Sequence, residues 1–385
     1  MRMVDWKKVR ADFPVTRDKV YLISAGMSPL PNQVLARVAA EYGKLNSCGD
    51  IHWDKDIDDH LGLRRRLCSR LGASGDDVAM MMNTSTVMSV IALSLRGVHG
   101  EGVGLVSVQD EFPSTTVPYE YQGVRMKYVK PESARYPVDA ILAELDDGTV
   151  GVVTSYVQYS TGFRQDLERL GGELKRLGKL FIVNATQGFP LFPIDVRRMR
   201  IDALSASLNK WGFAGHTGAM FYTSQEFRDK YPSPIAGWLS VDTRGKSFIH
   251  TAKGEPIKLH TSAQRYMLGS TSFESVNPLS TALDYLEGIG YDKIEARIME
   301  LGDRLIEGLR GIGVEIVSPV ANKKERSAII TLSVGARGEE CCRYLEGRGI
   351  YTSPRAGNVR TSLNIFNDES DISRLIEALK AFLSL

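Results

Sequence analysis

The chain has 385 residues, 43 % hydrophobic and 24 % charged, which is the composition of an ordinary globular protein. Its 48 basic and 46 acidic residues leave a formal net charge of +2, so the basic surface typical of a nucleic-acid-binding protein is missing. The charged N-terminal stretch MRMVDWKKVRADFP does not resemble a signal peptide, and no apolar run approaches the roughly 20 residues needed to cross a bilayer. This length predicts at least two domains.

Cysteines and histidines give no sign of a disulfide framework or a metal site. The four cysteines show no CxxC spacing and are Cys48, Cys68, Cys341 and Cys342. Their pattern is typical of a reducing compartment, so we expect a cytoplasmic protein. His52 and His60 flank an acidic stretch at a spacing that matches no common zinc motif, and we expect no metal. The run Arg64–Arg66 lies in an amphipathic helical pattern and predicts a solvated helix face.

From residue 76 to about residue 222, short apolar runs alternate with helical patterns. The runs that predict strands are DVAMMMN (77–83), VGLVSV (103–108), VRMKYV (124–129), VGVVTSYV (150–157), LFIVNA (180–185), DALSAS (202–207) and GAMFYT (218–223). Between them, TVMSVIALSL and DLERLGGELKRLG predict helices, and Gly178 is expected to end the second. This alternation predicts crossover connections and therefore a three-layer α/β fold with a doubly wound, mainly parallel sheet.

After about Gly269 the pattern changes to a smaller α+β unit. Two long helical stretches precede strands at VEIVSP and SAIITLSV, and a helix, a strand near NVRTSLN and a final helix follow. We therefore assign residues 16–268 to a large α/β domain, and residues 1–15 and 269–385 to a small α+β domain. The irregular stretch of residues 237–260 is expected to border the functional site.

Ligands of open parallel sheets bind outside the carboxyl ends of the strands, so the residues after each strand are the candidates for function. After the first strand, NTSTVMS leads into a helix, where Ser85 or Thr86 either caps the helix or belongs to a phosphate site. After the second strand, Phe112 either packs in the core or stacks on a planar ligand. Gln158 in SYVQYSTGFRQDL either binds a ligand or satisfies a turn.

Two further strand ends supply amides and a lysine. VNATQG places Asn184 and Gln187 after one strand, and ALSASLNKWGFAG places Ser207 and Lys210 after the next. A strand-end lysine alone is usually a surface charge. In series with a phosphate cradle and an aromatic ring, Lys210 instead predicts a site for pyridoxal 5′-phosphate (PLP). The lysine would form a Schiff base, which requires its deprotonated amine.

These residues resemble the class V aminotransferase family of fold-type I PLP enzymes, which includes cysteine desulfurases, isopenicillin-N-epimerase-like proteins and cystine lyases. The similarity covers nearly the whole chain and keeps the family order. The stretches that carry it are VYLISAGMSPLP, EFPS, SYVQYSTGFRQDL, VNATQGFPLFPIDV, SASLNKWG, GW at 237–238, RYMLGST at 265–271 and GNVRTSLNIFND.

The resemblance implies a role for each residue of the site. Lys210 would hold the cofactor covalently, Phe112 would stack on its ring, and Gln187, assisted by Gln158, would contact its 3′-oxygen. The residues that would contact the cofactor are Ser85, Thr86, Phe112, Gln158, Asn184, Gln187, Ser207, Asn209, Lys210, Ser270 and Thr271. Among these, Ser85, Thr86 and Ser207 would hold the phosphate.

Substrate and subunit contacts are implied in the same way. Arg360 would bind the substrate α-carboxylate through a bidentate pair, and Ser24 of the entry loop would also contact the substrate. Ser270 or Thr271 would reach the phosphate bound by a neighbouring subunit, which implies a homodimer with sites at the subunit interface.

The sequence departs from the family at two positions. Asn184 stands where the family has an aspartate beside the pyridine nitrogen, and a neutral amide gives hydrogen bonds but no charge. We therefore expect a weaker electron sink. Asn209 replaces the family histidine before the lysine, which removes that histidine's hydrogen bonds and proton-relay capacity.

The residues leave several reactions open. The loop YTSPRAGN lacks the nucleophilic cysteine of cysteine desulfurases, which disfavours a persulfide-forming desulfurase, and Cys341 and Cys342 fit helix packing. The leading hypothesis is an aminotransferase that acts on an amino acid. The alternatives are a C–S lyase or an amino-acid epimerase, and, in view of Asn184 and Asn209, a binding protein with impaired catalysis.

Overall fold

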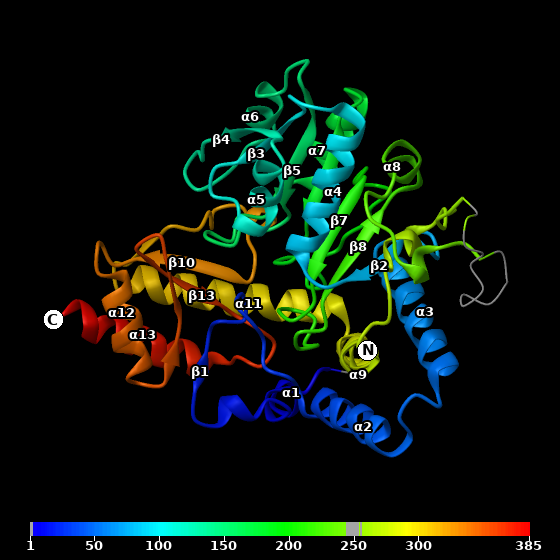
Figure 1. Ribbon diagram of the computed structural model, residues 1–385. Coiled ribbons are helices and arrows are strands. Elements are labelled where there is room, and N and C mark those ends of the chain that lie inside the picture. Colours follow the sequence, from blue (N-terminus) through cyan, green and yellow to red (C-terminus); the bar gives the residue numbers. More distant parts are fainter. Residues whose placement is uncertain (1–2, 244–253, 255) are drawn as a thin grey trace.

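A computed structural model describes residues 3–243, 254 and 256–385 (Figure 1). Its main element is a seven-stranded sheet in the order β2-β8-β7-β6-β5-β3-β4. The strands are β2 (Val78–Met81), β3 (Gly104–Val108), β4 (Arg125–Val129), β5 (Thr149–Ser155), β6 (Leu180–Asn184), β7 (Ala203–Ser207) and β8 (Ala219–Thr223). Strand β8 is antiparallel to both of its neighbours, and the other pairs are parallel. The mainly parallel sheet predicted from the sequence is confirmed.

Helices cover both faces of this sheet (Figure 1). Successive side chains of a strand point to opposite faces, so Val153 of β5 packs in one apolar cluster and Val152 in another. The first cluster includes Ile91 of α4, and the second includes Leu170 of α7. The helices of this part are α3 (Trp53–Arg70), α4 (Thr84–His99), α5 (Pro113–Tyr121), α6 (Val138–Ala143), α7 (Leu167–Arg176) and α8 (Gln225–Lys230). Two apolar faces of one sheet make the expected three-layer α/β fold.

A smaller antiparallel sheet follows in the order β12-β13-β10-β9. Its strands are β9 (Glu315–Ile316), β10 (Ile329–Ser333), β12 (Ser353–Arg355) and β13 (Asn358–Ser362). The helices of this region are α9 (Phe273–Val276), α10 (Pro278–Ile289), α11 (Tyr291–Gly311), α12 (Gly338–Glu346) and α13 (Glu369–Leu383). The predicted change of pattern after Gly269 thus corresponds to a second sheet with its own apolar cluster.

The N-terminal region lies against this smaller sheet. It contains α1 (Trp6–Ala11), β1 (Val20–Tyr21) and α2 (Asn32–Cys48), and β1 pairs in parallel with β11 (Ile350–Tyr351). Ile23 forms a further bridge to Ser362 of β13. A short strand of the region assigned to the large domain is therefore paired with the C-terminal part of the chain, and the domain boundaries at residues 16 and 269 stay predictions.

The loop after β5 is bound to the C-terminal part of the chain through four consecutive carbonyl groups, those of residues 159–162. Each carbonyl oxygen accepts a hydrogen bond from a side chain of that part. The pairs are Arg360 Nη1 to Tyr159 O (2.8 Å), Thr331 Oγ1 to Ser160 O (2.6 Å), Ser318 Oγ to Thr161 O (2.5 Å) and Ser327 Oγ to Gly162 O (2.7 Å). These bonds fix the end of β5 relative to the smaller sheet.

One expectation about the surface is wrong. Arg64 of α3 is 1 % exposed, and its Nε donates to the carbonyl oxygen of Val78 in β2 over 2.7 Å. Only Arg65 and Arg66 of that run lie toward solvent, and Arg66 pairs with Glu287. The whole Arg64 side chain, guanidinium included, is enclosed where α3 packs on β2, which a pattern of charges does not reveal.

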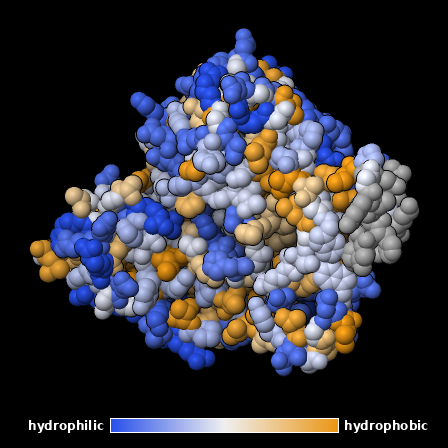
Figure 2. Space-filling view, viewed as in Figure 1, coloured by the Kyte–Doolittle hydropathy of each residue, from blue (hydrophilic) through white to orange (hydrophobic). Residues whose placement is uncertain are grey.

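The cysteines of the described residues are unpaired, and Cys341 and Cys342 lie buried on α12. Burial raises the pKa of both thiols, that of Cys341 to about 12, so neither is disposed to form a thiolate. In the part of the chain that the structure describes, none of the helices combines the length and apolar character needed to span a membrane. Figure 2 shows a face on which hydrophilic residues predominate and apolar residues form small groups.

Helix α7 lies close to the loop after β6 because of one glycine. A Cβ added at Gly171 would lie 1.8 Å from the carbonyl oxygen of Met199, whereas a Cβ at Gly172 would have no such neighbour within 4 Å. The helix ends before Gly178, whose φ of 65° is the left-handed conformation that glycine adopts without steric cost, as predicted.

These two glycines provide a matched test of the packing. Gly171→Ala should lower the free energy of unfolding by about 1–3 kcal/mol, because the backbone must move to admit a methyl group. Gly172→Ala, in the same helix, should raise it by up to about 1 kcal/mol through helix propensity. Urea unfolding followed by circular dichroism measures both, and equal effects of the two substitutions would contradict the close contact.

Candidate functional site

Three neighbouring parallel strands end side by side at one edge of the large sheet. Ser155 of β5 pairs with Asn184 of β6, and Asn184 pairs with Ser205 of β7. The loops after these strands leave the sheet at this edge, where open α/β sheets bind their ligands. A cavity lies there, and it is lined by Thr84, Phe112, Ser114, Ser155, Tyr159, Asn184, Thr186, Gln187, Ser207 and Lys210.

Half of this lining was predicted from the sequence. The predicted residues in the cavity wall are Phe112, Asn184, Gln187, Ser207 and Lys210. Of the other candidates, Gln158 is buried beside the wall, while Ser85 and Thr86 lie in the first turn of α4. The structure therefore gathers the strand-end residues into one place; of the residues expected to hold the phosphate, Ser207 lies in the cavity wall, and Ser85 and Thr86 lie outside it.

Hydroxyl groups form the part of the wall next to α4. Thr84 Oγ1 lies 2.9 Å from Ser207 Oγ and 3.4 Å from Thr186 Oγ1. The expectation that Ser85 or Thr86 caps α4 is wrong, because Asn83 is the N-cap and its Oδ1 accepts from the backbone N–H of Thr86 over 2.9 Å. This leaves Thr84 and Ser85 as the first residues of the helix, where backbone N–H groups have no partner within the helix and can bind an anion.

Lys210 follows β7 and reaches the cavity opposite an aromatic pair. Its Nζ lies 5.4 Å from the centre of the Phe112 ring, and that ring meets the ring of Tyr159 edge-on with centres 5.0 Å apart. Phe112 is 38 % exposed, so it is not a core residue. Burial, together with the charges of Arg360 and Arg355, lowers the pKa of Lys210 to about 8. A lysine in this environment is partly neutral near neutral pH.

Asn184 and Gln187 are held in place by hydrogen bonds. Asn184 Nδ2 donates to Thr115 Oγ1 over 2.8 Å, and its Oδ1 accepts from the backbone N–H of Thr186 over 3.1 Å. Gln187 Nε2 donates to the carbonyl of Ala25, and its Oε1 accepts from the indole of Trp211, both over 2.9 Å. An amide has two donor hydrogens and two acceptor lone pairs, so each side chain keeps hydrogen-bonding capacity for a ligand.

A buried carboxyl group lies behind this wall. Glu111 accepts hydrogen bonds from the backbone N–H groups of Phe112 (2.9 Å) and Ser155 (2.7 Å), and Ser155 Oγ also donates to it. Gln158 Nε2 donates to the same carboxyl over 3.3 Å. Burial raises the pKa of Glu111, and the hydrogen bonds oppose that shift. In the structure the Gln158 amide thus donates to Glu111. This bond does not test whether Gln158 also contacts a ligand, which stays a prediction.

Sequence reasoning missed Thr84 and Glu111 although both stand in the motifs that it used. Thr84 is the first hydroxyl of NTSTVMS, and Glu111 immediately precedes Phe112 in QDEFPS. The position of the N-cap decides which hydroxyl faces the cavity, and the signal was Asn83, a favoured capping residue immediately before Thr84. For Glu111 the sequence carries no comparable signal, because two of its partners, Ser155 and Gln158, lie more than 40 residues away along the chain.

Arg360 approaches the site from β13 and is only 2 % exposed. Its Nη1 donates to the carbonyl of Tyr159, whereas its Nε and Nη2 have no partner in the described part of the chain. Burial and the charge of Arg355 lower the pKa of Arg360 to about 9. A buried guanidinium with two unsatisfied N–H groups is suited to a carboxylate that comes from outside the chain.

The remaining candidates lie outside the cavity wall. Ser24 is buried and its Oγ accepts from Asn364 Nδ2 over 3.1 Å, while Asn209 is half-buried next to Lys210. Ser270 is exposed and Thr271 partly exposed. Within the stretch of residues 237–260 that was expected to border the site, residues 244–253 and 255 lie outside the described residues.

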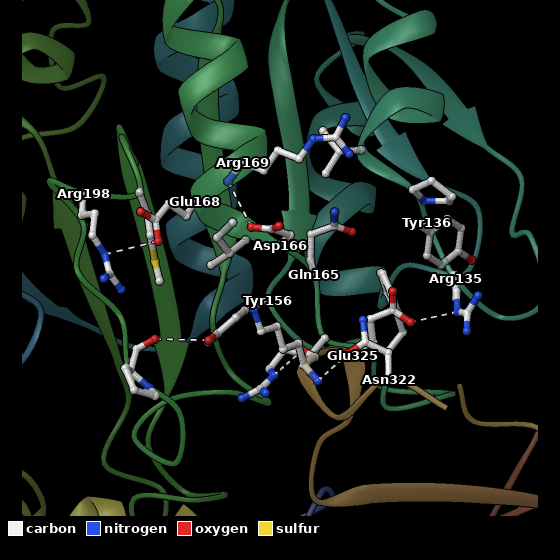
Figure 3. A pocket seen from close by; sticks show the side chains of 18 of the residues that line it. Arg135, Tyr136, Tyr156, Gln165, Asp166, Glu168, Arg169, Arg198, Asn322 and Glu325 are labelled. Atoms are coloured by element: carbon white, nitrogen blue, oxygen red, sulfur yellow. Dashed lines mark hydrogen bonds and ion pairs between the residues drawn. The ribbon is translucent and has the colours of Figure 1, made fainter. Parts of the chain in front are cut away.

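A larger cavity of about 830 Å³ lies near the start of α7 and holds none of the predicted residues (Figure 3). Its charged side chains pair with one another across the cavity walls. The pairs are Arg135 with Glu325 (2.9 Å), Arg164 with Glu295 (3.2 Å) and Arg198 with Glu168 (3.4 Å). The smaller cavity at the strand ends, where Arg360 lacks such a partner, is therefore the better candidate for chemistry.

Comparisons with known proteins identify the family and the fold. The pattern of the family described as Aminotransferase class-V matches residues 20–375. A probable cysteine desulfurase of Pyrococcus abyssi is 24 % identical over 85 % of this chain and 81 % of its own length. An uncharacterized aminotransferase of Bacillus subtilis is 22 % identical over 97 % of both chains. The solved apo structure of a cysteine desulfurase from Thermococcus onnurineus superimposes with a TM-score of 0.89 at 20 % identity, covering 100 % of this chain and 99 % of that one.

The family match spans most of the chain, including the strand ends and Arg360. It confirms the resemblance and the fold drawn from the sequence, and with them an enzyme that depends on PLP. The chain belongs to the class V aminotransferase family.

Proposed function

We propose that this protein transfers the amino group of an α-amino acid, with PLP held covalently by Lys210. The observation that carries the proposal is the position of Lys210, whose pKa is lowered to about 8, in a cavity shared with an aromatic ring and a hydroxyl cluster. One of the relatives is named as an aminotransferase, which supports this reaction, although its own activity is uncharacterized.

The residues of the cavity fit the parts of PLP. The hydroxyls of Thr84 and Ser207 and the first turn of α4 suit a phosphate, and the exposed ring of Phe112 suits a stacked pyridine. Asn184 and Gln187 keep hydrogen-bonding capacity for the ring nitrogen and the 3′-oxygen. When bound, PLP withdraws electrons from the α-carbon of an amino acid and so makes its bonds easier to break.

Within this site the protein's own groups would bind the substrate and move a proton. Arg360 would bind the α-carboxylate through its unpartnered N–H groups. Lys210 Nζ would take the proton from the α-carbon and return it elsewhere, as general base and then general acid. An amine with a pKa of about 8 suits both steps, since its two forms coexist near neutral pH.

A C–S lyase reaction is the second candidate. Relatives named as probable cysteine desulfurases favour it, because their names place C–S bond cleavage in this family. A mechanism with a cysteine as sulfur acceptor is disfavoured, since Cys341 and Cys342 are buried on α12 and neither lines the cavity. Epimerisation begins with the same proton transfer and stays a further alternative.

The proposed assembly is a homodimer. Ser270 and Thr271 lie outside the cavity wall of their own chain and are at least partly exposed, as expected for residues that reach a second subunit. Large apolar side chains are also exposed near the start of the chain and beside α4, namely Leu35, Tyr42, Leu45, Ile51 and Met82. Light scattering of the purified protein tests this by its mass in solution.

The central experiment asks whether PLP is attached at Lys210 and which product forms. The purified protein should take up PLP, absorb visible light, and carry the cofactor on Lys210 after borohydride reduction, as read by mass spectrometry. A panel of amino acids with detection of keto acid, pyruvate, sulfide and racemised amino acid then separates the reactions. A colourless protein that cannot be loaded would instead support the binding protein with impaired catalysis, and sulfide with pyruvate would favour the lyase.

The rate of PLP attachment to the cofactor-free protein should rise with pH and level off above about pH 8, because only neutral Lys210 attacks the aldehyde. About one tenth of the lysine is neutral one pH unit below its pKa. Stopped-flow absorbance over a pH series measures this rate. Arg360→Gln removes a positive charge that lowers the pKa of Lys210, so the midpoint should move to higher pH. A midpoint that stays near the ordinary lysine value in the unmodified protein would contradict the assignment.

Asn184→Asp should accelerate release of the α-proton about tenfold or more, because a carboxylate stabilises a protonated ring nitrogen by charge and each pKa unit corresponds to about a factor of ten. Thr115 is placed to accommodate the change, since its hydroxyl now accepts from Asn184 and can rotate to donate to a carboxylate. Exchange of the α-hydrogen with deuterated water, followed by NMR, gives the rate. An unchanged or slower exchange, with equal PLP occupancy, would show that this position does not limit the reaction.

A further inference from the structure

Two arginines share one face of the hairpin formed by β12 and β13. Arg360 lies opposite Ser353, and Arg355 lies opposite Asn358. Paired residues of an antiparallel ladder point to the same face, and residues two apart on one strand do so too. Arg355 and Arg360 are therefore diagonal neighbours on the face from which Arg360 reaches the carbonyl of Tyr159 in the cavity wall.

Both guanidinium groups act on the reactive lysine, and neither is neutralised. The charges of Arg360 and Arg355 both contribute to the lowered pKa of Lys210, and Arg355 lowers the pKa of Arg360. Among the described residues no carboxylate forms an ion pair with either arginine, and the nearby Glu111 is hydrogen-bonded to Phe112, Ser155 and Gln158 instead. Three cationic groups thus lie close enough to influence one another's pKa, and the structure records no ion pair for either arginine among the described residues.

The environment of Arg355 leaves its side chain available. It is half-buried, and its Nη1 donates to the adjacent carbonyl of Pro354 over 2.7 Å. This bond leaves the other N–H groups of the guanidinium available for a ligand. An unpaired arginine near a second one is unfavourable unless an anion binds both. A substrate with a single carboxylate would occupy Arg360 and leave Arg355 uncompensated.

We propose that Arg355 binds an anionic group on the substrate side chain, so that the enzyme acts on short acidic α-amino acids, those with a second carboxylate or a sulfinate. The inference rests on the proposed function. Arg360 binds the α-carboxylate, and Arg355 forms a charge-assisted pair with the second anionic group. In a transamination the matching partner is a dicarboxylic 2-keto acid, which satisfies the same two arginines.

Equilibrium binding to the PLP-loaded protein tests the two-arginine site without turnover. Succinate carries two carboxylates and butyrate one, and both perturb the visible absorbance of bound cofactor if they enter the site. Succinate should bind at least tenfold more tightly than butyrate. Arg355→Gln should abolish this difference, and Arg355→Lys should restore part of it. The control Arg348→Gln removes one positive charge from the same region, where Arg348 Nη1 donates to the carbonyl of Tyr344, and should leave the difference unchanged.

Kinetics with aspartate and asparagine complete the test, because the two substrates differ in charge and hardly in size. Arg355→Gln should lower kcat/KM for aspartate at least tenfold, mainly through KM, and change that for asparagine less than twofold. Equal losses for both substrates, or a wild-type enzyme without a preference for aspartate and succinate, would overturn the assignment of Arg355. A protein that takes up no PLP at Lys210 would refute the proposed function itself, whereas a loaded enzyme that converts only neutral amino acids would refute this inference alone.

Discussion

The parallel register of β5, β6 and β7 is the constraint on which the site depends. It aligns Ser155, Asn184 and Ser205 across the edge of the sheet and sends the three following loops into the same space. The loop after each strand then contributes a side chain to the cavity: Tyr159 after β5, Gln187 after β6 and Lys210 after β7. A shift of one residue in any of these strands would turn its polar end residue to the opposite face and separate Lys210 from Asn184.

Charge is distributed unevenly around this edge. The carboxyl group of Glu111 is buried behind the wall and fully hydrogen-bonded, while Lys210 and Arg360 lie on the side proposed to receive the substrate. In the proposed site, Asn184 would leave the ring nitrogen of PLP without a negative charge beside it. The cavity is therefore more positive than a site with an aspartate there, which favours anions in the ground state and weakens electron withdrawal. An asparagine in place of an aspartate at position 184 would therefore strengthen the binding of anions and slow the chemical step.

Much of the fold could be predicted because the strands are apolar on both faces and the helices between them have a clear period. β5 and β6 show this most plainly, and every strand of the large sheet except β5 lies within a predicted run, β5 beginning one residue earlier, at Thr149. The strand-end residues Asn184, Gln187 and Lys210 followed from that reading together with the family resemblance. What the sequence could not show depends on contacts between distant segments: the burial of Arg64 under β2, the bonds that hold Glu111, and the pairing of β1 with β11.

The four carbonyl groups of residues 159–162 have a consequence beyond the geometry of the loop. They bind the end of β5 to Arg360, Thr331, Ser318 and Ser327, so the arginine proposed to bind the substrate and the strand that borders the cavity share one set of hydrogen bonds. Because these donors are scattered over β9 to β13, a harmful replacement at one of them can be offset by a change at another. In evolutionary terms, the C-terminal sheet and the β5 loop should accumulate substitutions together, as a single epistatic unit, rather than drift as two independent pieces.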